Sequence, residues 1–383
     1  MGLAGGGERP MMGLAKIAPD GWAYYAREIA AGVEDYFVGH GEEAGRWVGR
    51  GADALGLAGE VDAEGLSCLF GRGLDPATGV PLGRPFGTDK STVAGYALSF
   101  SPPKSVSVLW ALAAPEVTLQ VREAHDAAVV SVLEFLQDHA AFCRRGHAGA
   151  VQEPTRGYVG AVFVHRTSRA GDPQLHSHVL VANKVQAVSD GRWLSVDGRE
   201  LYEVQKAAGM LYKAALRAEL TTRLEVAWGE VDGNGGAEIT GVPESLIAEF
   251  SKRRAQVEAT AARLVGEKEA TLGRSLTGDE RAAVFQLAAY QSRATKSRAG
   301  GETTGQLRER WRTEATAAGL APEPWLGQVF GRRTVTGREA VLSRLGLRPS
   351  MELALVEAID RLERSHSTWG RAQAVEVLSV VLP

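Results

Sequence analysis

The chain has 383 residues, of which 44% are hydrophobic and 23% charged, and its formal net charge is −3. This length exceeds one ordinary compact core, so we expect two structural units and a tail. No apolar run is long enough for a bilayer and no signal-like segment begins the chain, so we expect no membrane insertion and a cytoplasmic location. The slightly acidic balance disfavours a uniformly basic surface, so any nucleic-acid binding would depend on a local groove.

The N-terminal region combines an irregular segment with a tyrosine-bearing helix. Residues 1–11 are Gly-rich, and we expect a disordered extension there. Residues 18–32 predict a helix, with Asp20 as the N-cap and Gly32 at the C-terminal end. This helix and the residues just after it carry Tyr24, Tyr25 and Tyr36.

The middle of the chain alternates between strand and helix patterns. Residues 93–100 alternate as a strand does, and 116–141 have the strongest helical periodicity in the chain. Two short apolar strands follow at 158–165 and 178–185, and the polar residues from 166 to 176 connect them.

A hairpin and a helical region complete the pattern. Asp190-Gly191 predicts a hairpin that pairs 183–188 with 192–196. Helical patterns then dominate the rest of the chain: 202–227, 244–266, segments between 269 and 320, and the tail after 330. We therefore expect an α+β core followed by a helical subdomain.

Three histidines are placed to meet on one sheet face. His176 and His178 are two residues apart at the start of a strand, so their side chains point the same way. His165 ends the preceding strand, and antiparallel pairing would bring it opposite that start. Three imidazoles with open coordination positions are the pattern of a catalytic metal site. The other histidines lie on expected helices or loops without partners and receive no role: His40, His125, His139, His147 and His366.

Three imidazole ligands leave the metal and the chemistry open. Ligand softness favours zinc, copper, nickel or manganese over magnesium, but availability in the cell also decides, so Mg, Mn and Zn all remain candidates. A three-histidine non-haem iron oxygenase is an alternative function. It would be expected on an all-β cupin-like chain, and the long helices argue against it.

Four blocks resemble the TrwC/TraI (MOBF) conjugative relaxases of the HUH endonuclease class, in the same order as in that family. They are WAYYAREIAAGVEDYF (22–37), GRWVGRGADALGLAGEVD (45–62), GYALSFSPPKSVSVLWAL (95–112) and FVHRTSRAGDPQLHSHVLVANKV (163–185). The likeness runs from about 12 to 322.

The resemblance implies a fold and a set of partners. The fold would be a palm-like antiparallel sheet flanked by helices, with the palm at 12–235, helical fingers at 236–322, and at 323–383 a helical tail or the start of a helicase domain. The partners would be single-stranded or hairpin DNA of the origin of transfer, accessory transfer proteins and a type IV secretion coupling protein. The protein would act as a monomer and could pass into the recipient cell. The chain has no Gly-x-x-x-x-Gly-Lys-Ser/Thr loop, so no ATPase activity is assigned.

The resemblance also implies a reaction and its residues. A metal-assisted tyrosine would nick one DNA strand, stay bound to the 5′ phosphate and free a 3′ hydroxyl. Tyr24 matches the principal nucleophile and Tyr36 a second one, whereas Tyr25 is equally explained by packing. His165, His176 and His178 match the metal ligands.

One position departs from the family pattern. Ala97 stands where relatives carry an acidic residue that supports a metal histidine or the tyrosine. Support would then have to come from Asp172 or from a backbone carbonyl. An origin-binding module that cleaves weakly or not at all is therefore a further alternative.

Five basic residues are candidates for phosphate contacts: Lys104, Arg169, Lys252, Arg253 and Arg254. Each of them is also explained as an ordinary solvated surface charge.

Overall fold

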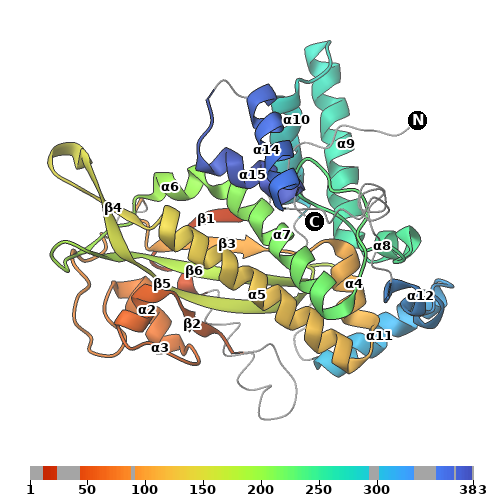
Figure 1. Cartoon of the computed structure of the whole chain (residues 1–383), viewed down its shortest axis with the longest axis horizontal. Coiled ribbons are helices and arrows are strands. Elements are labelled where there is room, and N and C mark those ends of the chain that lie inside the picture. Colours follow the sequence, from red (N-terminus) through yellow and green to blue (C-terminus); the bar gives the residue numbers. More distant parts are fainter. Residues whose placement is uncertain are drawn as a thin grey trace.

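The computed structural model describes residues 12–23, 44–87, 91–292, 302–331, 351–365 and 368–381. Within these residues an antiparallel sheet has the order β1-β3-β6-β5-β2, with β4 paired to β5 and β7 paired to β6 (Figure 1). The strands are β1 (Gly13–Ile17), β2 (Arg46–Val48), β3 (Gly95–Phe100), β4 (Phe142–Arg145), β5 (Val151–Thr167), β6 (Pro173–Ala187) and β7 (Trp193–Leu194).

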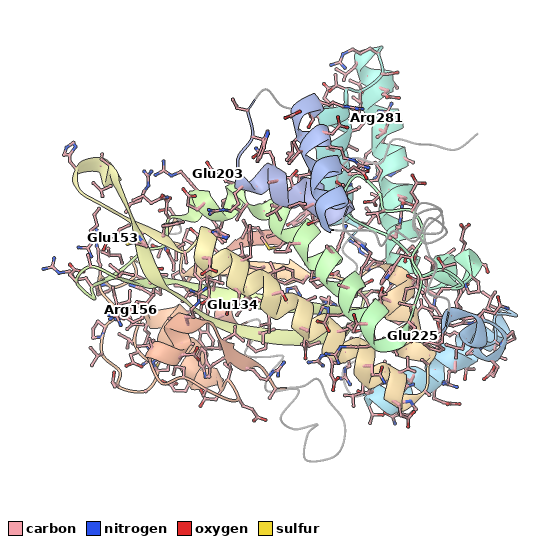
Figure 2. All side chains as sticks on the ribbon, viewed as in Figure 1. Glu134, Glu153, Arg156, Glu203, Glu225 and Arg281 are labelled. Carbon is pink, nitrogen blue, oxygen red and sulfur yellow. The ribbon has the colours of Figure 1, made fainter. Side chains whose placement is uncertain are left out.

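The two central strands, β5 and β6, are longer than the sequence indicates. The expected strands at 158–165 and 178–185 both extend, and the connection shrinks to the five residues 168–172. The missed half of β5 is polar and largely exposed, so it lacks the apolar alternation that predicts strands. It forms a ribbon with β4 that projects from the sheet and carries Glu153 and Arg156 (Figure 2).

Helices cover one face of the sheet. Long helices α5 (Pro115–His139) and α7 (Gln205–Leu224) lie across it with α4 (Lys104–Leu112) beside them (Figure 1). The expected helix at 116–141 is confirmed with small shifts at its ends. The expected helix at 202–227 is divided at Val204 into α6 (Gly198–Glu203) and α7.

The sheet separates a large core from a small one. Along β6, Val179 and Val181 join the large core under α5 and α7, whereas Leu180 and Ala182 join the small core. This is the two-residue alternation of a strand buried on both faces. The small core is closed by a segment with α2 (Arg50–Ala54), α3 (Ala63–Leu66) and the π-helix η1 (Ser67–Arg72).

A helical region follows the palm. Its helices are α8 (Glu244–Glu249), α9 (Lys252–Leu272), α10 (Gly278–Gln291), α11 (Thr304–Ala317) and α12 (Pro322–Val329). The expected helix at 244–266 is broken at Phe250, which is fully buried and leaves helical geometry, and at Ser251, which is the N-cap residue of α9. Gly273, at φ +63°, ends α9 in the left-handed conformation that glycine adopts without strain.

The C-terminal helices return to the palm. Helix α15 (Arg371–Val381) packs on α7, and α14 (Met351–Ser365) packs on α15 (Figure 1). Buried Arg217 of α7 donates hydrogen bonds to the carbonyl oxygens of Gly235 (2.6 Å) and Ser379 (2.7 Å). In the part of the chain that the structure describes, no helix is both long and apolar enough for a bilayer.

Candidate metal centre

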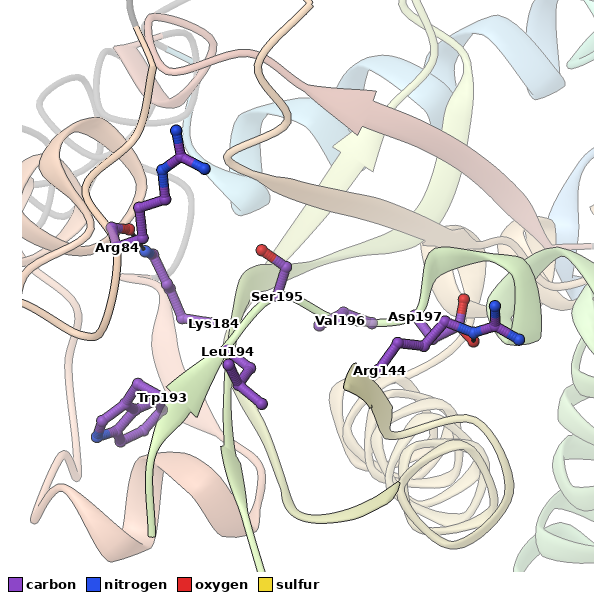
Figure 3. A pocket seen from close by; sticks show the side chains of 8 residues that line it. All are labelled: Arg84, Arg144, Lys184, Trp193, Leu194, Ser195, Val196 and Asp197. Carbon is purple, nitrogen blue, oxygen red and sulfur yellow. Dashed lines mark hydrogen bonds and ion pairs between the residues drawn. The ribbon is translucent and has the colours of Figure 1, made fainter. Parts of the chain in front are cut away.

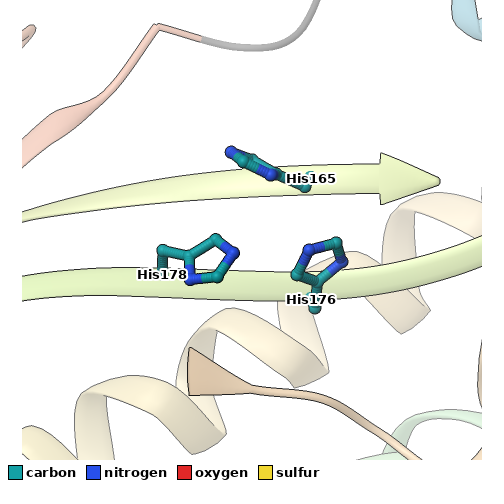
Figure 4. Close-up of side chains that lie close together, drawn as sticks. All are labelled: His165, His176 and His178. Atoms are coloured by element: carbon teal, nitrogen blue, oxygen red, sulfur yellow. The ribbon is translucent and has the colours of Figure 1, made fainter. Parts of the chain in front are cut away.

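The structure brings His165, His176 and His178 together on one face of the sheet. His165 of β5 is the direct cross-strand partner of His176 of β6, and His178 lies two residues further on the same face. The three ring centroids are 4.9–5.1 Å apart, and one nitrogen of each ring lies within 4.8 Å of the others (Figure 4). No other cluster of at least three possible metal ligands is found among the described residues.

Two of the imidazoles are oriented through Nδ1. Nδ1 of His176 lies 2.8 Å from the carbonyl oxygen of Gln174. Because a carbonyl oxygen only accepts, Nδ1 of His176 carries the proton and Nε2 keeps the lone pair that binds a metal. Nδ1 of His178 lies 2.9 Å from Oγ of Ser99, its direct neighbour on β3.

The surroundings of His176 favour its neutral form. Loss of hydration, together with the neighbouring His165 and His178, lowers the pKa of His176 to about 3. A neutral imidazole is the form that binds a metal, so His176 is ready as a ligand at neutral pH.

Asp172 and a backbone carbonyl were the two groups expected to support the imidazoles, and the structure shows only the carbonyl beside them. Ala97 lies on β3 two residues before Ser99 and packs in the small core. Asp172 is buried elsewhere: Lys252 Nζ lies 3.6 Å from its Oδ1. Burial raises the pKa of Asp172, against the lowering effect of Lys104 and Lys252. The support seen at the rings is the Gln174 carbonyl, together with the Ser99 hydroxyl that sequence reasoning missed.

Two histidines expected to lack partners have them, which corrects that expectation. His125 is fully buried, with Nδ1 2.7 Å from Oη of Tyr212 and Nε2 2.7 Å from Oγ of Ser177. Burial and the charge of Arg122 lower the pKa of His125 to about 3.

His139 accepts a hydrogen bond from Arg371 across 2.8 Å. Helical periodicity shows which face a residue occupies, but it does not show what a distant segment places against that face. His147 is exposed, and His40 and His366 lie outside the described residues.

The proposed tyrosines, Tyr24, Tyr25 and Tyr36, also lie outside the described residues. The described strand before them begins beside the histidine cluster. Strand β1 pairs with β3, so that Gly13 lies opposite Ser99, and β1 then runs away from the cluster until Ile17 lies opposite Gly95. Trp22 packs against the small core.

The five basic candidates have different surroundings. Nζ of Lys104 donates to the carbonyl of Pro173 (3.0 Å) and to Oε1 of Gln174 (2.7 Å), and burial lowers its pKa to about 8. Arg253 donates to backbone carbonyls at the end of α10. These internal bonds weaken the case for phosphate contacts by Lys104 and Arg253.

The other three basic candidates lie nearer the surface. Lys252 Nζ lies 2.7 Å from a carboxylate oxygen of Glu314, and Arg254 forms an exposed ion pair with Glu258. Arg169 is exposed in the turn between β5 and β6. Phosphate contact by Arg169 and Arg254 stays a prediction.

A second cationic feature lies at the other end of β6. A hollow there is lined by Arg84, Arg144, Lys184 and residues 193–197 (Figure 3). Nζ of buried Lys184 donates to the carbonyl oxygen of Arg84, and Arg144 pairs with Asp197 at 2.6 Å. Sequence reasoning missed this hollow because its cations are far apart in the chain.

Comparison with known proteins identifies the family. The family model for TrwC relaxase matches residues 18–318. The chain belongs to the TrwC relaxase family. It is 32% identical over 253 residues to the multifunctional conjugation protein TraI of Escherichia coli (strain K12). That match covers 63% of this chain but only 14% of TraI, so the chain spans a small part of that relative.

Solved TrwC structures have the same fold. The conjugative relaxase TrwC bound to oriT DNA in its metal-bound form superposes with a TM-score of 0.63 at 28% identity, covering 80% of this chain and 98% of that one. A copper-bound complex of TrwC with oriT DNA gives a TM-score of 0.62 at 29% identity over the same shares. The α+β palm with a helical second part is therefore the TrwC relaxase fold.

Proposed function

We propose that this chain is a relaxase, a metal-dependent transesterase that nicks one strand of DNA at an origin of transfer. The observation that carries the proposal is the convergence of His165, His176 and His178 on the sheet of a TrwC-family fold. TrwC itself has been solved with oriT DNA, and the TraI relative is described as a conjugation protein.

The donor set fits a divalent metal ion. The three imidazoles offer nitrogens within 4.8 Å of one another, and the carbonyl of Gln174 fixes which nitrogen of His176 is available. His165, His176 and His178 would hold the ion and leave positions open on it. When bound, the ion supplies Lewis-acid stabilisation of charge on a non-bridging phosphate oxygen. Imidazole ligands suit zinc and manganese better than magnesium, and all three are retained as candidates.

The chain's own residues would carry the remaining chemistry. The Tyr24 phenol would attack the scissile phosphorus, so that a bond forms between its oxygen and phosphorus while the bond to the 3′ oxygen breaks. The phenol loses its proton and the departing 3′ oxygen gains one. The product is a 5′-phosphotyrosine with a free 3′ hydroxyl, and Tyr36 would serve a later strand transfer. Conserving the phosphodiester bond energy lets the strand be rejoined without an added cofactor.

The proposal includes the setting of the reaction. The substrate is single-stranded or hairpin DNA of the origin of transfer, bound by a palm at 12–235 and fingers at 236–322. Accessory transfer proteins and a type IV secretion coupling protein would be its partners in a bacterial cytoplasm. The chain would act as a monomer.

A covalent-capture experiment tests the proposal. The full chain is incubated with heat-denatured fragments of total DNA from the organism that carries the gene, with EDTA or with Mg²⁺, Mn²⁺ or Zn²⁺. We expect a metal-dependent adduct that survives denaturing electrophoresis, with the modified peptide containing Tyr24. Tyr24→Phe should abolish it, whereas the matched variant Tyr25→Phe should retain it.

Other outcomes would favour the alternatives. DNA retained without an adduct at any metal concentration would favour an origin-binding module that cleaves weakly or not at all. Oxygen consumption with Fe²⁺ and no adduct would favour the oxygenase. An adduct of undiminished yield in Tyr24→Phe would contradict the assigned nucleophile.

A further inference from the structure

A buried network of hydrogen-bonded side chains lies directly behind the histidine cluster. Ser177 stands between His176 and His178 on β6, so its side chain points to the opposite face of the strand. Its Oγ lies 2.7 Å from Nε2 of His125 on α5, and Nδ1 of His125 lies 2.7 Å from Oη of Tyr212 on α7. Ser177, His125 and Tyr212 have no solvent exposure.

Burying this network of polar groups costs free energy unless all of its hydrogen bonds are made. It lies within the large apolar core, and the rings of Tyr212 and Phe100 are 5.4 Å apart. Apolar side chains of similar size would fill the same space without the cost of burying polar atoms. Bonding on both imidazole nitrogens instead gives the core one defined arrangement. It ties helices α5 and α7 to a single point on β6, and that point lies between two of the three imidazoles.

The strand pairing becomes irregular directly beside this point. The register of β5 against β6 shifts between His165 and Thr167, directly beside the pair His165–His176. A second irregularity lies between Tyr158 and Gly160. A metal site tolerates errors of only about 0.5 Å in its ligands, so an additional restraint near His176 and His178 matters.

We propose that Tyr212 and His125 are positioning residues for the metal centre, acting through Ser177 to hold the His176–His178 segment where its imidazoles converge with His165. This inference rests on the proposed metal site. Tyr212→Phe keeps the ring but removes the hydroxyl that bonds His125 Nδ1, and Ser177→Ala removes the hydroxyl that bonds His125 Nε2. Neither substitution touches a metal ligand.

The test is a Co²⁺ titration of the full, metal-free chain, followed by the visible absorption of the bound ion. We expect Tyr212→Phe and Ser177→Ala to weaken Co²⁺ binding about 10- to 100-fold and to change the absorption spectrum. Tyr158→Phe is the matched control. Tyr158 is a buried tyrosine on β5 whose hydroxyl has no hydrogen-bond partner among the described residues. The Co²⁺ affinity of Tyr158→Phe should therefore stay within about twofold of that of the parent, because no such bond is lost.

Each outcome has one meaning. A lower melting temperature with unchanged Co²⁺ affinity and spectrum would show a merely structural role and overturn the inference alone. If Tyr212→Phe fails to fold, the smaller change Ser177→Ala decides. If the parent chain binds no Co²⁺, or if His178→Ala binds Co²⁺ as tightly as the parent does, both the proposed metal centre and the proposed positioning residues are overturned.

Discussion

The groups on Nδ1 determine how the imidazole cluster can work. The Gln174 carbonyl holds the proton of His176 on Nδ1, and the Ser99 hydroxyl meets Nδ1 of His178. Groups of this kind orient a metal-binding ring and make its other nitrogen a better ligand. The chain thus carries neutral partners at Nδ1 of two of the three rings.

The role of Ser99 can be tested with a single methyl-for-hydroxymethyl change. Ser99→Ala removes the partner of His178 Nδ1, so we expect affinity for Zn²⁺ or Mn²⁺ to fall about tenfold in equilibrium dialysis. Ser101→Ala, an exposed serine two residues later, is the control and should bind as the parent does. Equal affinity in Ser99→Ala would show that the hydroxyl does not support the ring.

Placing an acidic residue at position 97 should strengthen the site. Ala97 lies on the histidine face of β3 and is 7% exposed, so a carboxylate there needs a cationic or hydrogen-bonding partner. We expect Ala97→Asp to bind the metal more tightly or to form more covalent DNA adduct than the parent. Its metal-free form should also be less stable. Equal adduct yields across a metal titration would contradict this prediction.

The residue scale shows how far sequence reasoning reaches. The two-residue spacing and the strand-end position of His165 were sufficient to predict that three imidazoles meet. The supporting groups could not be predicted, because Ser99 and His178 are 79 positions apart and His125 and Ser177 are 52 apart. Nothing in a local pattern indicates which serine meets which ring.

At the scale of elements, the turn between β5 and β6 is held by helix α11. Nε1 of Trp311 donates to the carbonyl oxygen of Gly171 at 2.9 Å, and Nη2 of Arg310 lies 3.3 Å from the same oxygen. The helical region thereby fixes the turn that leads into His176 and His178. The short turn itself was not predicted, because its polar flanks resemble a longer loop.

Two matched tryptophan variants test the hydrogen bond between Trp311 and the Gly171 carbonyl. Trp311→Phe removes a buried hydrogen bond and should lower the free energy of unfolding in urea by about 1–2 kcal/mol more than Trp325→Phe does. Trp325 is the control because it is also buried and, within the described ranges of the chain, its Nε1 has no hydrogen-bond partner. Equal losses in the two variants would mean that the bond to Gly171 contributes nothing.

The link between α5, β6 and α7 through His125 predicts an acid sensitivity. The folded pKa is lowered to about 3, so below pH 6.5 the unfolded chain binds a proton that the folded chain does not. Stability is therefore lost as pH falls from 6.5 towards 3. Between pH 6.5 and 5 this one group should cost roughly 1–2 kcal/mol.

Urea unfolding at several pH values checks this. Because other histidines also titrate, the informative quantity is the difference between the parent and His125→Gln. The variant should lose less stability than the parent over that interval. Parallel curves would mean that His125 is protonated equally in both states.

At the scale of the whole molecule, the sheet separates a large helix-covered core from a small one, and the histidines lie on the small-core face. The fold class followed from alternating strand and helix patterns. The packing of α15 on α7 did not, because Arg217 reaches the Ser379 carbonyl across 162 positions. Long-range contacts of this kind depend on the assembled fold and leave no local signature.

The central claim is that three imidazoles hold one divalent cation within reach of Tyr24. The most direct measurement is a crystal of the full chain grown with equimolar Zn²⁺ and examined by anomalous scattering. We predict a single strong peak about 2.1 Å from one nitrogen of each of His165, His176 and His178, with the Tyr24 hydroxyl facing it. A peak elsewhere, or a Tyr24 hydroxyl on the opposite side of the sheet, would contradict the account.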